Sequence, residues 1–256
     1  DVTINPDFGQ VEVDPAVINL SAFETRFREK RPFFVKDAQI FRFYEHTNLF
    51  YSRRIGRKPR GSAPSGSDFE NIPTQTTILG AAKLTGRSAG GLSIGALTAL
   101  TGREKGTAYY NSNQSTQEFM VEPRTQYGVF KAQQDFRDGA SVVGGMVTLL
   151  NRELPDDGSF DFLTSRAYGA GINFEHYWGG SRSRDWSLGG FYANSYIKGS
   201  NEALLRIQRA SNHFFQRPNA TRFAVDSTAT SMTGRNWRLQ FERQSSAHWT
   251  GSIWAA

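Results

Sequence analysis

The chain has 256 residues and no cysteine, which excludes a disulfide-stapled fold, a thiolate metal site and a cysteine nucleophile. It contains no run of about 18 apolar residues, so the sequence predicts no transmembrane helix; residues 140–150 come nearest, and Ser, Gly and Thr interrupt them. Histidine is scarce, and His46, His176, His213 and His248 show no metal-ligand spacing. We therefore expect neither a metal nor a cofactor.

The composition instead favours many amphipathic strands. Aromatic residues make up 13% of the chain and there are 25 glycines, although the mean hydropathy is −0.51. The net charge of +6 is compatible with an acidic polymer as partner, with a basic face or with an arginine-lined lumen. No nucleic-acid-binding aromatic motif accompanies the basic run, so we expect salt bridges there and no nucleic-acid partner. This run consists of Arg53, Arg54, Arg57, Lys58 and Arg60.

The chain divides into three regions of different composition. Residues 1–57 hold short apolar clusters without a sustained period, in which we expect a short strand near Val11–Val13 and a helical turn at Ala22–Phe27. Residues 58–73 form a connector rich in Pro, Gly and Ser. About 57 residues without disulfides make only a marginal core. We therefore expect the first region to pack on or in the structure formed by residues 74–256.

From residue 74 onward, strand-like segments alternate with turns that contain Gly, Asp or Asn. Several connections are too short for a crossover helix, so neighbouring strands should pair antiparallel. GRSAGG at 86–91 predicts a hairpin turn, and PDDGSFD at 155–161 predicts a plain turn because it lacks the full calcium-loop pattern. Residues 201–217 predict a helix inside a long loop, capped by Asn201 and stopped by Pro218. We expect strands near residues 75–86, 91–102, 118–136, 140–152, 164–178, 184–198, 229–245 and 247–255.

Residues 168–178 and 236–242 alternate sharply between apolar and polar, so each segment presents a dry face and a wet face. The candidate lipid-facing residues are Tyr168, Ile172, Phe174, Trp178, Trp237, Leu239 and Phe241. The candidate lumen-facing polar residues are Lys83, Asn173, Glu175, Arg238, Gln240 and Glu242. A soluble sandwich or barrel with its core on the dry side would give the same alternation.

Three features favour a membrane barrel. The expected strands are long, aromatic residues lie toward strand ends, and long charged side chains occupy mid-strand positions of the wet face. We therefore predict an all-β fold, an antiparallel meander forming part of an outer-membrane-type β-barrel, with an irregular N-terminal segment and one short loop helix. The last expected strand ends without a turn or a partner, so residues 74–256 should form an open, curved sheet, incomplete at its C-terminal end.

Several motifs carry a family resemblance. NPDFGQVEVDPAVINLSAFET at 5–25, EKRPFF at 29–34 and LFYSRRIGR at 49–57 resemble the signature block of domain-of-unknown-function family 5916. AAKLTGR at 81–87, the following GGLSIGALTALT and QRASNHFFQRPNA at 208–220 fit the same family in order. The chain departs from its pattern at Arg28, where the family has Pro, and at Val35–Asp37, where the family has Leu-Glu-Gly.

The resemblance implies an outer-membrane β-barrel region of a Gram-negative envelope protein, a region that often follows a family-9-like carbohydrate-binding module. It implies no known activity. We therefore expect a fragment of a bacterial outer-membrane protein that contacts outer-membrane lipid, serves envelope transport or surface binding with glycans as the candidate ligand class, and is not catalytic. Two alternatives stay open: a carbohydrate-active enzyme such as a glycoside hydrolase, and a soluble β-sandwich binding module. The enzyme would use the early carboxylates Asp7, Glu12, Asp14, Glu24 and Glu29.

Overall fold

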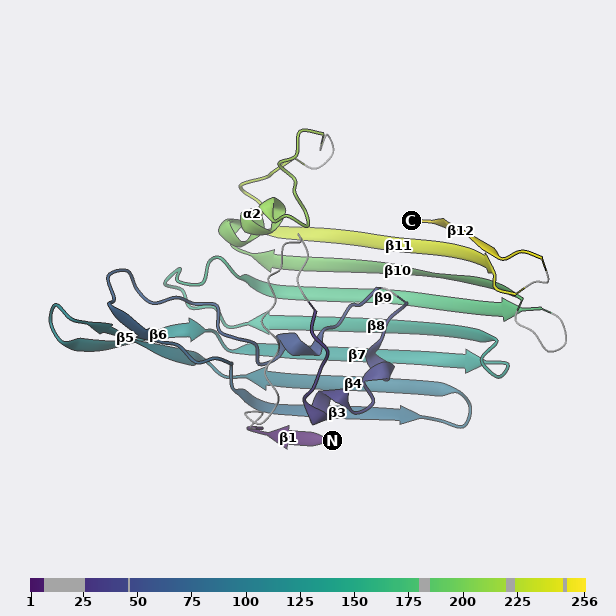
Figure 1. Cartoon of the computed structure of the whole chain (residues 1–256), viewed down its shortest axis with the longest axis horizontal. Helices are drawn as coiled ribbons and strands as arrows, with labels where there is room; N and C mark the ends of the chain where they lie inside the picture. Colours follow the sequence, from purple (N-terminus) through teal and green to yellow (C-terminus); the bar gives the residue numbers. More distant parts are fainter. Residues whose placement is uncertain (7–25, 46, 180–184, 220–223, 246–247) are drawn as a thin grey trace.

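The computed structural model describes residues 1–6, 26–45, 47–179, 185–219, 224–245 and 248–256. Most strands form one antiparallel nine-stranded sheet in the order β1-β3-β4-β7-β8-β9-β10-β11-β12 (Figure 1). Its strands are β1 (Val2–Ile4), β3 (Ile78–Arg87), β4 (Leu92–Thr101), β7 (Thr125–Phe136), β8 (Ser141–Arg152), β9 (Thr164–Trp178), β10 (Trp186–Gly199), β11 (Ser231–Arg243) and β12 (Gly251–Ala255). Within the described residues the sheet is open, because β1 and β12 lie at its two edges and do not pair with each other.

A second, three-stranded sheet combines two strands that lie between β4 and β7 in the chain with one strand that precedes β3. It consists of β2 (Phe69–Asn71), β5 (Glu104–Tyr110) and β6 (Ser115–Glu122), in the order β2-β5-β6. Figure 1 shows this small sheet extending beyond one end of the large one, at the left of the view. The backbone of Gly61 joins it to the connector, since Gly61 N donates to Val121 O at 2.8 Å.

The two ends of the large sheet differ in the length of their connections. At one end, residues 88–91 and 137–140 form tight turns, helped by the positive φ of Gly91 (84°) and Gly139 (76°). At the other end, residues 102–124, 153–163 and 200–230 make long excursions, which include the small sheet and helix α2 (Asn201–Arg209). We call these the short-turn end and the long-loop end.

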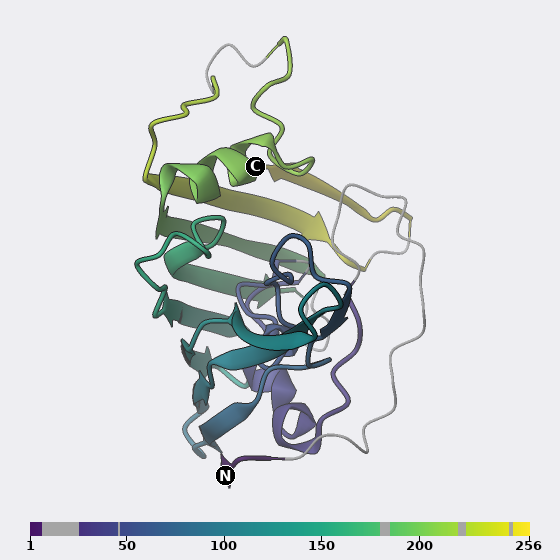
Figure 2. The same ribbon diagram turned by 90° about the vertical axis from the view of Figure 1, so that its left-hand side faces the viewer.

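The N-terminal segment, described over residues 26–45 and 47–57, has only short helical turns: α1 (Pro32–Val35), η1 (Ala38–Phe41) and η2 (Ser52–Arg54). Figure 2 shows this segment on one side of the large sheet, which curves around it. The main hydrophobic core lies between the two. From the segment it takes Phe34, Phe41, Phe43, Tyr44 and Ile55, and from the sheet Ile78, Ala81, Leu97, Ala99, Tyr127, Val129, Met146, Phe191 and Ala193. Among the described residues, no helix is both long enough and apolar enough to cross a membrane.

The structure confirms the all-β antiparallel prediction, the open sheet and the hairpin turn at 86–91. It corrects the expected strand at 118–136, which is two strands, β6 and β7, in different sheets. Pro123, between them, has no N–H for a ladder, so the pairing can change there. The structure also adds β5, which lies between the strands expected at 91–102 and 118–136. The expected strand near Val11–Val13 and most of the expected turn at Ala22–Phe27 lie outside the described residues.

The predicted loop helix is present but shorter than expected. It ends at Arg209, not at residue 217, because Ala210 adopts an extended conformation (ψ 147°). Its cap is Ser200 and not Asn201: Ser200 Oγ accepts a hydrogen bond from Ala203 N at 3.1 Å. Leu204 is fully buried and anchors the helix beside β10.

Candidate functional site: the two faces of the large sheet

The two predicted sets of residues lie on opposite faces of the large sheet. We call the face toward the N-terminal segment the covered face and the other the outer face. The cross-strand pairs Asn173–Phe191 and Phe191–Arg238 lie on the covered face, whereas Ile172–Tyr192 and Tyr192–Trp237 lie on the outer face. All six candidate lumen-facing residues fall on the covered face, where Lys83 and Asn173 are buried and Glu175, Arg238, Gln240 and Glu242 are half-buried. All seven candidate lipid-facing residues fall on the outer face and are exposed.

Two lysines of the covered face hold the N-terminal segment by its backbone. Lys83 is 4% exposed, and its Nζ donates to Phe33 O and Lys36 O, both at 2.6 Å. These carbonyls belong to α1 and its C-terminal cap, where the helix leaves acceptors unpaired and favours a cation. Lys131, 5% exposed, donates in the same way to Arg42 O. Lys131 was not among the residues predicted from the sequence. Its place among the inward-facing residues of a strand is the feature that could have indicated it.

The two most specific motifs of the segment meet in one ion-pair cluster. Arg31 Nε and Nη2 donate to the two carboxylate oxygens of Glu29 at 2.8 and 2.7 Å, and Ser52 Oγ donates to the same carboxylate at 2.6 Å. Arg31 Nη1 also donates to Ile55 O at 2.6 Å, so EKRPFF at 29–34 is joined to SRRIGR at 52–57. Burial alone would raise the pKa of Glu29, but Arg31 and Ser52 hold it below its usual value.

Apolar side chains of the segment, most of them aromatic, enter sites that glycines of the sheet leave open. A Cβ atom at Gly171 would lie 2.5 Å from Phe43 Cζ, and one at Gly95 would lie 2.7 Å from Ile40 Cγ2. Phe43 and Tyr44 both pack on the ring of Phe191, at centroid distances of 5.8 and 5.2 Å. Burial raises the pKa of Tyr44 to about 12, and the carboxylates of Glu45 and Glu175 add to that shift. The glycines therefore set where the segment sits.

A cavity of about 330 Å³ remains between the segment and the sheet. From the segment, Arg26, Asn48, Tyr51 and Arg54 line it, and the Arg26 guanidinium lies 5.8 Å from the Tyr51 ring centroid. The Tyr51 hydroxyl is fixed by the backbone of Phe27, which it binds through both N and O. The volume is at the lower end of the range of small-molecule sites.

Most of the outer face from β3 to β12 is apolar, with exposed polar exceptions such as Asn194 and Arg235, and nothing among the described residues covers it. Its exposed side chains include Ile172, which is 65% exposed, and Leu239, 45%. Exposed apolar patches of more than a few hundred Å² mark contact surfaces for protein or membrane. The large exposed members are Leu84, Leu92, Leu100, Phe130, Phe136, Val143, Val147, Leu149, Tyr168, Ile172, Phe174, Trp178, Tyr192, Tyr196, Trp237, Leu239, Phe241 and Ile253.

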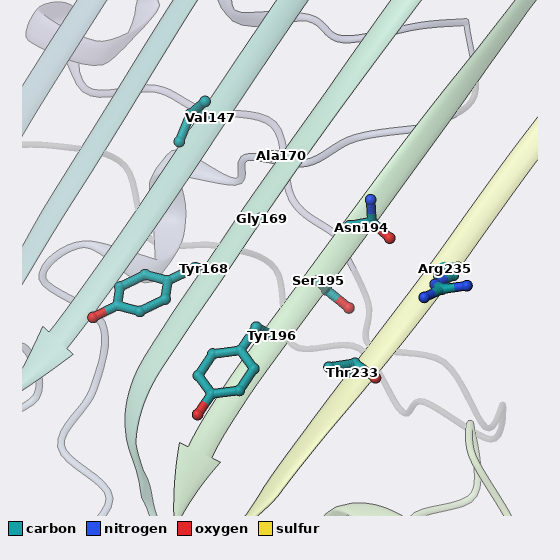
Figure 3. A pocket seen from close by; sticks show the side chains of 9 residues that line it. All are labelled: Val147, Tyr168, Gly169, Ala170, Asn194, Ser195, Tyr196, Thr233 and Arg235. Atoms are coloured by element: carbon teal, nitrogen blue, oxygen red, sulfur yellow. The ribbon is translucent and has the colours of Figure 1, made fainter.

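Aromatic clusters bound this apolar face at both ends. Tyr168 and Tyr196 stack at the long-loop end, with centroids 6.2 Å apart and rings 14° from parallel (Figure 3). At the short-turn end, Trp186 stacks on Phe241 at 5.2 Å, and Phe241 lies 6.0 Å from Trp178. Arg243 lies over Trp186 at 4.9 Å and over Trp249 at 4.4 Å. Amphipathic residues thus frame an apolar middle.

The other sequence candidates have structural roles or lie outside the described residues. Arg60 of the basic run forms an ion pair with Glu122, as expected for that run. His176 packs on Trp178 and bonds Ser141 Oγ at 2.8 Å. Within the described parts of the chain, no group of three or more His, Asp or Glu side chains could hold a metal. Of the early carboxylates, only Glu29 is described; the undescribed ones are Asp7, Glu12, Asp14 and Glu24.

Comparison with known proteins adds the family. No curated protein and no solved structure matches the chain. The family model described as Domain of unknown function (DUF5916) matches residues 1–183, which include the N-terminal segment, both lysines that hold it and the strands from β1 to β9. The chain therefore belongs to the DUF5916 family.

Proposed function

We propose that the chain forms part of the wall of a bacterial outer-membrane β-barrel, with its outer face against lipid and the N-terminal segment held on the lumen side. The observation that carries the proposal is the uncovered apolar face framed by aromatic residues at both ends. From Tyr168 to Trp178 along β9 the rise is about 33 Å at ~3.3 Å per residue. A strand tilt of about 40° reduces this to roughly 25 Å, the height of the apolar band of outer-membrane barrels.

The lengths of the connections between strands also fit a barrel wall and indicate which end of it faces outward. Outer-membrane barrels have short periplasmic turns and longer extracellular loops. The short-turn end, with residues 88–91 and 137–140, would then face the periplasm, and the long-loop end would face outward. The covered face would be the lumen face, because lumen residues are polar and alternate with lipid-facing ones.

Within this barrel we propose a role in transport or surface binding, with a glycan as the ligand class and no catalysis. The resemblance to a family whose members often follow a carbohydrate-binding module supports the glycan. So does the 330 Å³ cavity, which combines the Tyr51 ring with polar side chains of Arg26, Asn48 and Arg54. Glu29, the described carboxylate among the enzyme candidates, is engaged by Arg31 and Ser52, which argues against its use as an acid or base.

Two experiments test the proposal. The full-length protein, purified in detergent, should show heat-modifiable gel migration and protease-protected fragments in liposomes; a protein that stays monomeric without detergent would contradict the membrane assignment. For the ligand, a glycan panel should give binding that Tyr51→Ala weakens and that Tyr109→Ala leaves unchanged, since Tyr109 lies on the small sheet. Binding that is equally strong in both variants would remove the cavity as the glycan site.

A further inference from the structure

A polar pocket of about 450 Å³ opens beside the apolar face at its long-loop end. It lies where β7, β8 and β9 begin or end, and its polar lining comprises Arg124, Gln126, Asn151, Arg152, Glu153 and Arg166. The covered-face interactions described above use none of these side chains. The pocket is therefore a separate feature of the molecule.

The pocket carries an excess of positive charge and unused donors. Its single acid, Glu153, is shared between Arg103 at 3.2 Å, which lies outside the pocket, and Arg124 at 4.0 Å. The Nε atom of Arg124 is buried and has no hydrogen-bond partner among the described residues. Arg152 takes no part in this, because it alternates with Asn151 along β8 and so lies on the covered face, where its Nη1 donates to Thr164 O at 2.6 Å. Arg166 is exposed and has no ion-pair partner in the described part of the chain. An anion with several oxygens would satisfy these guanidinium groups.

An apolar groove of about 320 Å³ adjoins the arginine pocket, and Tyr168 lines both. Val147, Ala170 and Tyr196 form the apolar part of the groove, and Figure 3 shows the Tyr168 and Tyr196 rings side by side. The Tyr168 hydroxyl donates to Asn151 Oδ1 at 2.9 Å, which orients this ring at the junction. A cationic pocket thus continues directly into an apolar track.

We propose that the arginine pocket binds the phosphate of an anionic lipid headgroup, whose acyl chain lies in the Tyr168–Tyr196 groove. A headgroup phosphate supplies oxygens for the guanidinium groups, and its attached chain supplies the apolar ligand for the groove. The site rests on the proposed function, because it requires the outer face to meet lipid. With the long-loop end outward, the bound lipid belongs to the outer leaflet.

The test is native mass spectrometry of the full-length protein in detergent, titrated with phosphatidic acid, with phosphatidylcholine and with inorganic phosphate alone. Phosphatidic acid should bind most tightly. Arg124→Gln and Arg166→Gln should each weaken its binding about tenfold, the effect of losing one charge-assisted hydrogen bond. The matched control is Arg209→Gln, which removes an exposed positive charge from helix α2 at the same end of the sheet; Arg209 does not line the pocket.

Three outcomes would overturn the site. They are unchanged affinity in both pocket-arginine variants, an equal loss of affinity in Arg209→Gln, and inorganic phosphate binding as tightly as the lipid. If a glutamine variant loses its heat-modifiable migration, the corresponding lysine variant, Arg124→Lys or Arg166→Lys, is measured in its place. Lysine keeps the positive charge but cannot donate two parallel hydrogen bonds as a guanidinium does, so a severalfold loss of affinity for phosphatidic acid is expected. Protease protection in pure phosphatidylcholine liposomes is measured in parallel. If the protein is protected from protease but shows no preference for phosphatidic acid, only this site is refuted. If the protein is not protected from protease, the barrel itself is refuted.

Discussion

Replacing Leu239 with Arg places a charge near the middle of the outer face. Across from β11, Tyr196 pairs with Thr233 and Trp186 pairs with Arg243, so Leu239 lies between the levels of the two aromatic clusters. Its side chain is 45% exposed, and its cross-strand neighbours are Gly190 and Ala255. Position 239 is therefore not part of a packed protein core.

The expected penalty depends on what covers this face. Against lipid, Arg near the bilayer midplane costs about 2–4 kcal/mol of unfolding free energy. Against water, an exposed substitution changes stability by only about 0.5 kcal/mol. The control Thr233→Arg lies on the same strand and face but at the level of Tyr196, where lipid should impose about 0–1 kcal/mol. Leu239→Trp should be tolerated, because small neighbours and fluid lipid accommodate the ring.

Urea unfolding of the full-length protein in liposomes measures these differences, with intrinsic tryptophan fluorescence as the signal for the two Arg variants. A penalty for Leu239→Arg that exceeds that of Thr233→Arg by about 1–3 kcal/mol is expected. Equal, small penalties would show that the face meets water. A penalty of more than about 1 kcal/mol for Leu239→Trp, measured by far-UV circular dichroism, would show that another protein surface packs on it.

Three further predictions concern the N-terminal segment. Gly171→Ala should destabilise the protein by roughly 1–3 kcal/mol in urea unfolding, because its Cβ would lie 2.5 Å from Phe43 Cζ; Gly86→Ala, with open space around it, should change stability by about 0.5 kcal/mol at most. Because the folded-state pKa of Glu29 is lowered, its stabilisation is present above the ordinary value near 4.5 and is lost as the pH falls through the folded-state value. The stability gap between wild type and Glu29→Gln should therefore be wide at pH 7 and close in acid; a gap independent of pH would contradict this. Residues 1–57 expressed alone should show no cooperative melt by circular dichroism, because their apolar side chains need the large sheet to pack on. A sigmoidal melt would show that the segment folds without the sheet.

The sequence was informative where side chains alternate between two environments. In β9 and β11 the period of two separates Ile172 from Asn173 and Leu239 from Arg238, and the structure places each pair on opposite faces. In β5 the buried positions are the small residues Gly106 and Ala108, and in β6 residues 116–118 are all exposed, so neither strand shows the apolar alternation that would distinguish it from a polar loop. Their boundary with β7 depends on long-range pairing that local pattern does not contain.

The contacts of the N-terminal segment could not be read from the sequence. The motif EKRPFF was recognisable, but its joining to SRRIGR through Arg31 and Ser52 depends on how an irregular chain folds back on itself. Lys83 was expected to face a wet lumen, and the structure buries it under Phe33 and Lys36. A mid-strand lysine indicates an inward polar position, but does not say which carbonyl it will meet.

The hydrogen bonds from Lys83 and Lys131 end on main-chain oxygens of Phe33, Lys36 and Arg42. They therefore follow the path of the segment's backbone, and no side chain at those three positions supplies an acceptor, although the Lys83 ammonium also lies 5.2 Å from the centre of the Phe33 ring. Exchanging these side chains leaves every acceptor in place. Inserting one residue between Lys36 and Arg42 would instead displace one acceptor from the other by up to about 3.5 Å, more than a hydrogen bond tolerates. The spacing of this stretch is thus more tightly constrained than its composition.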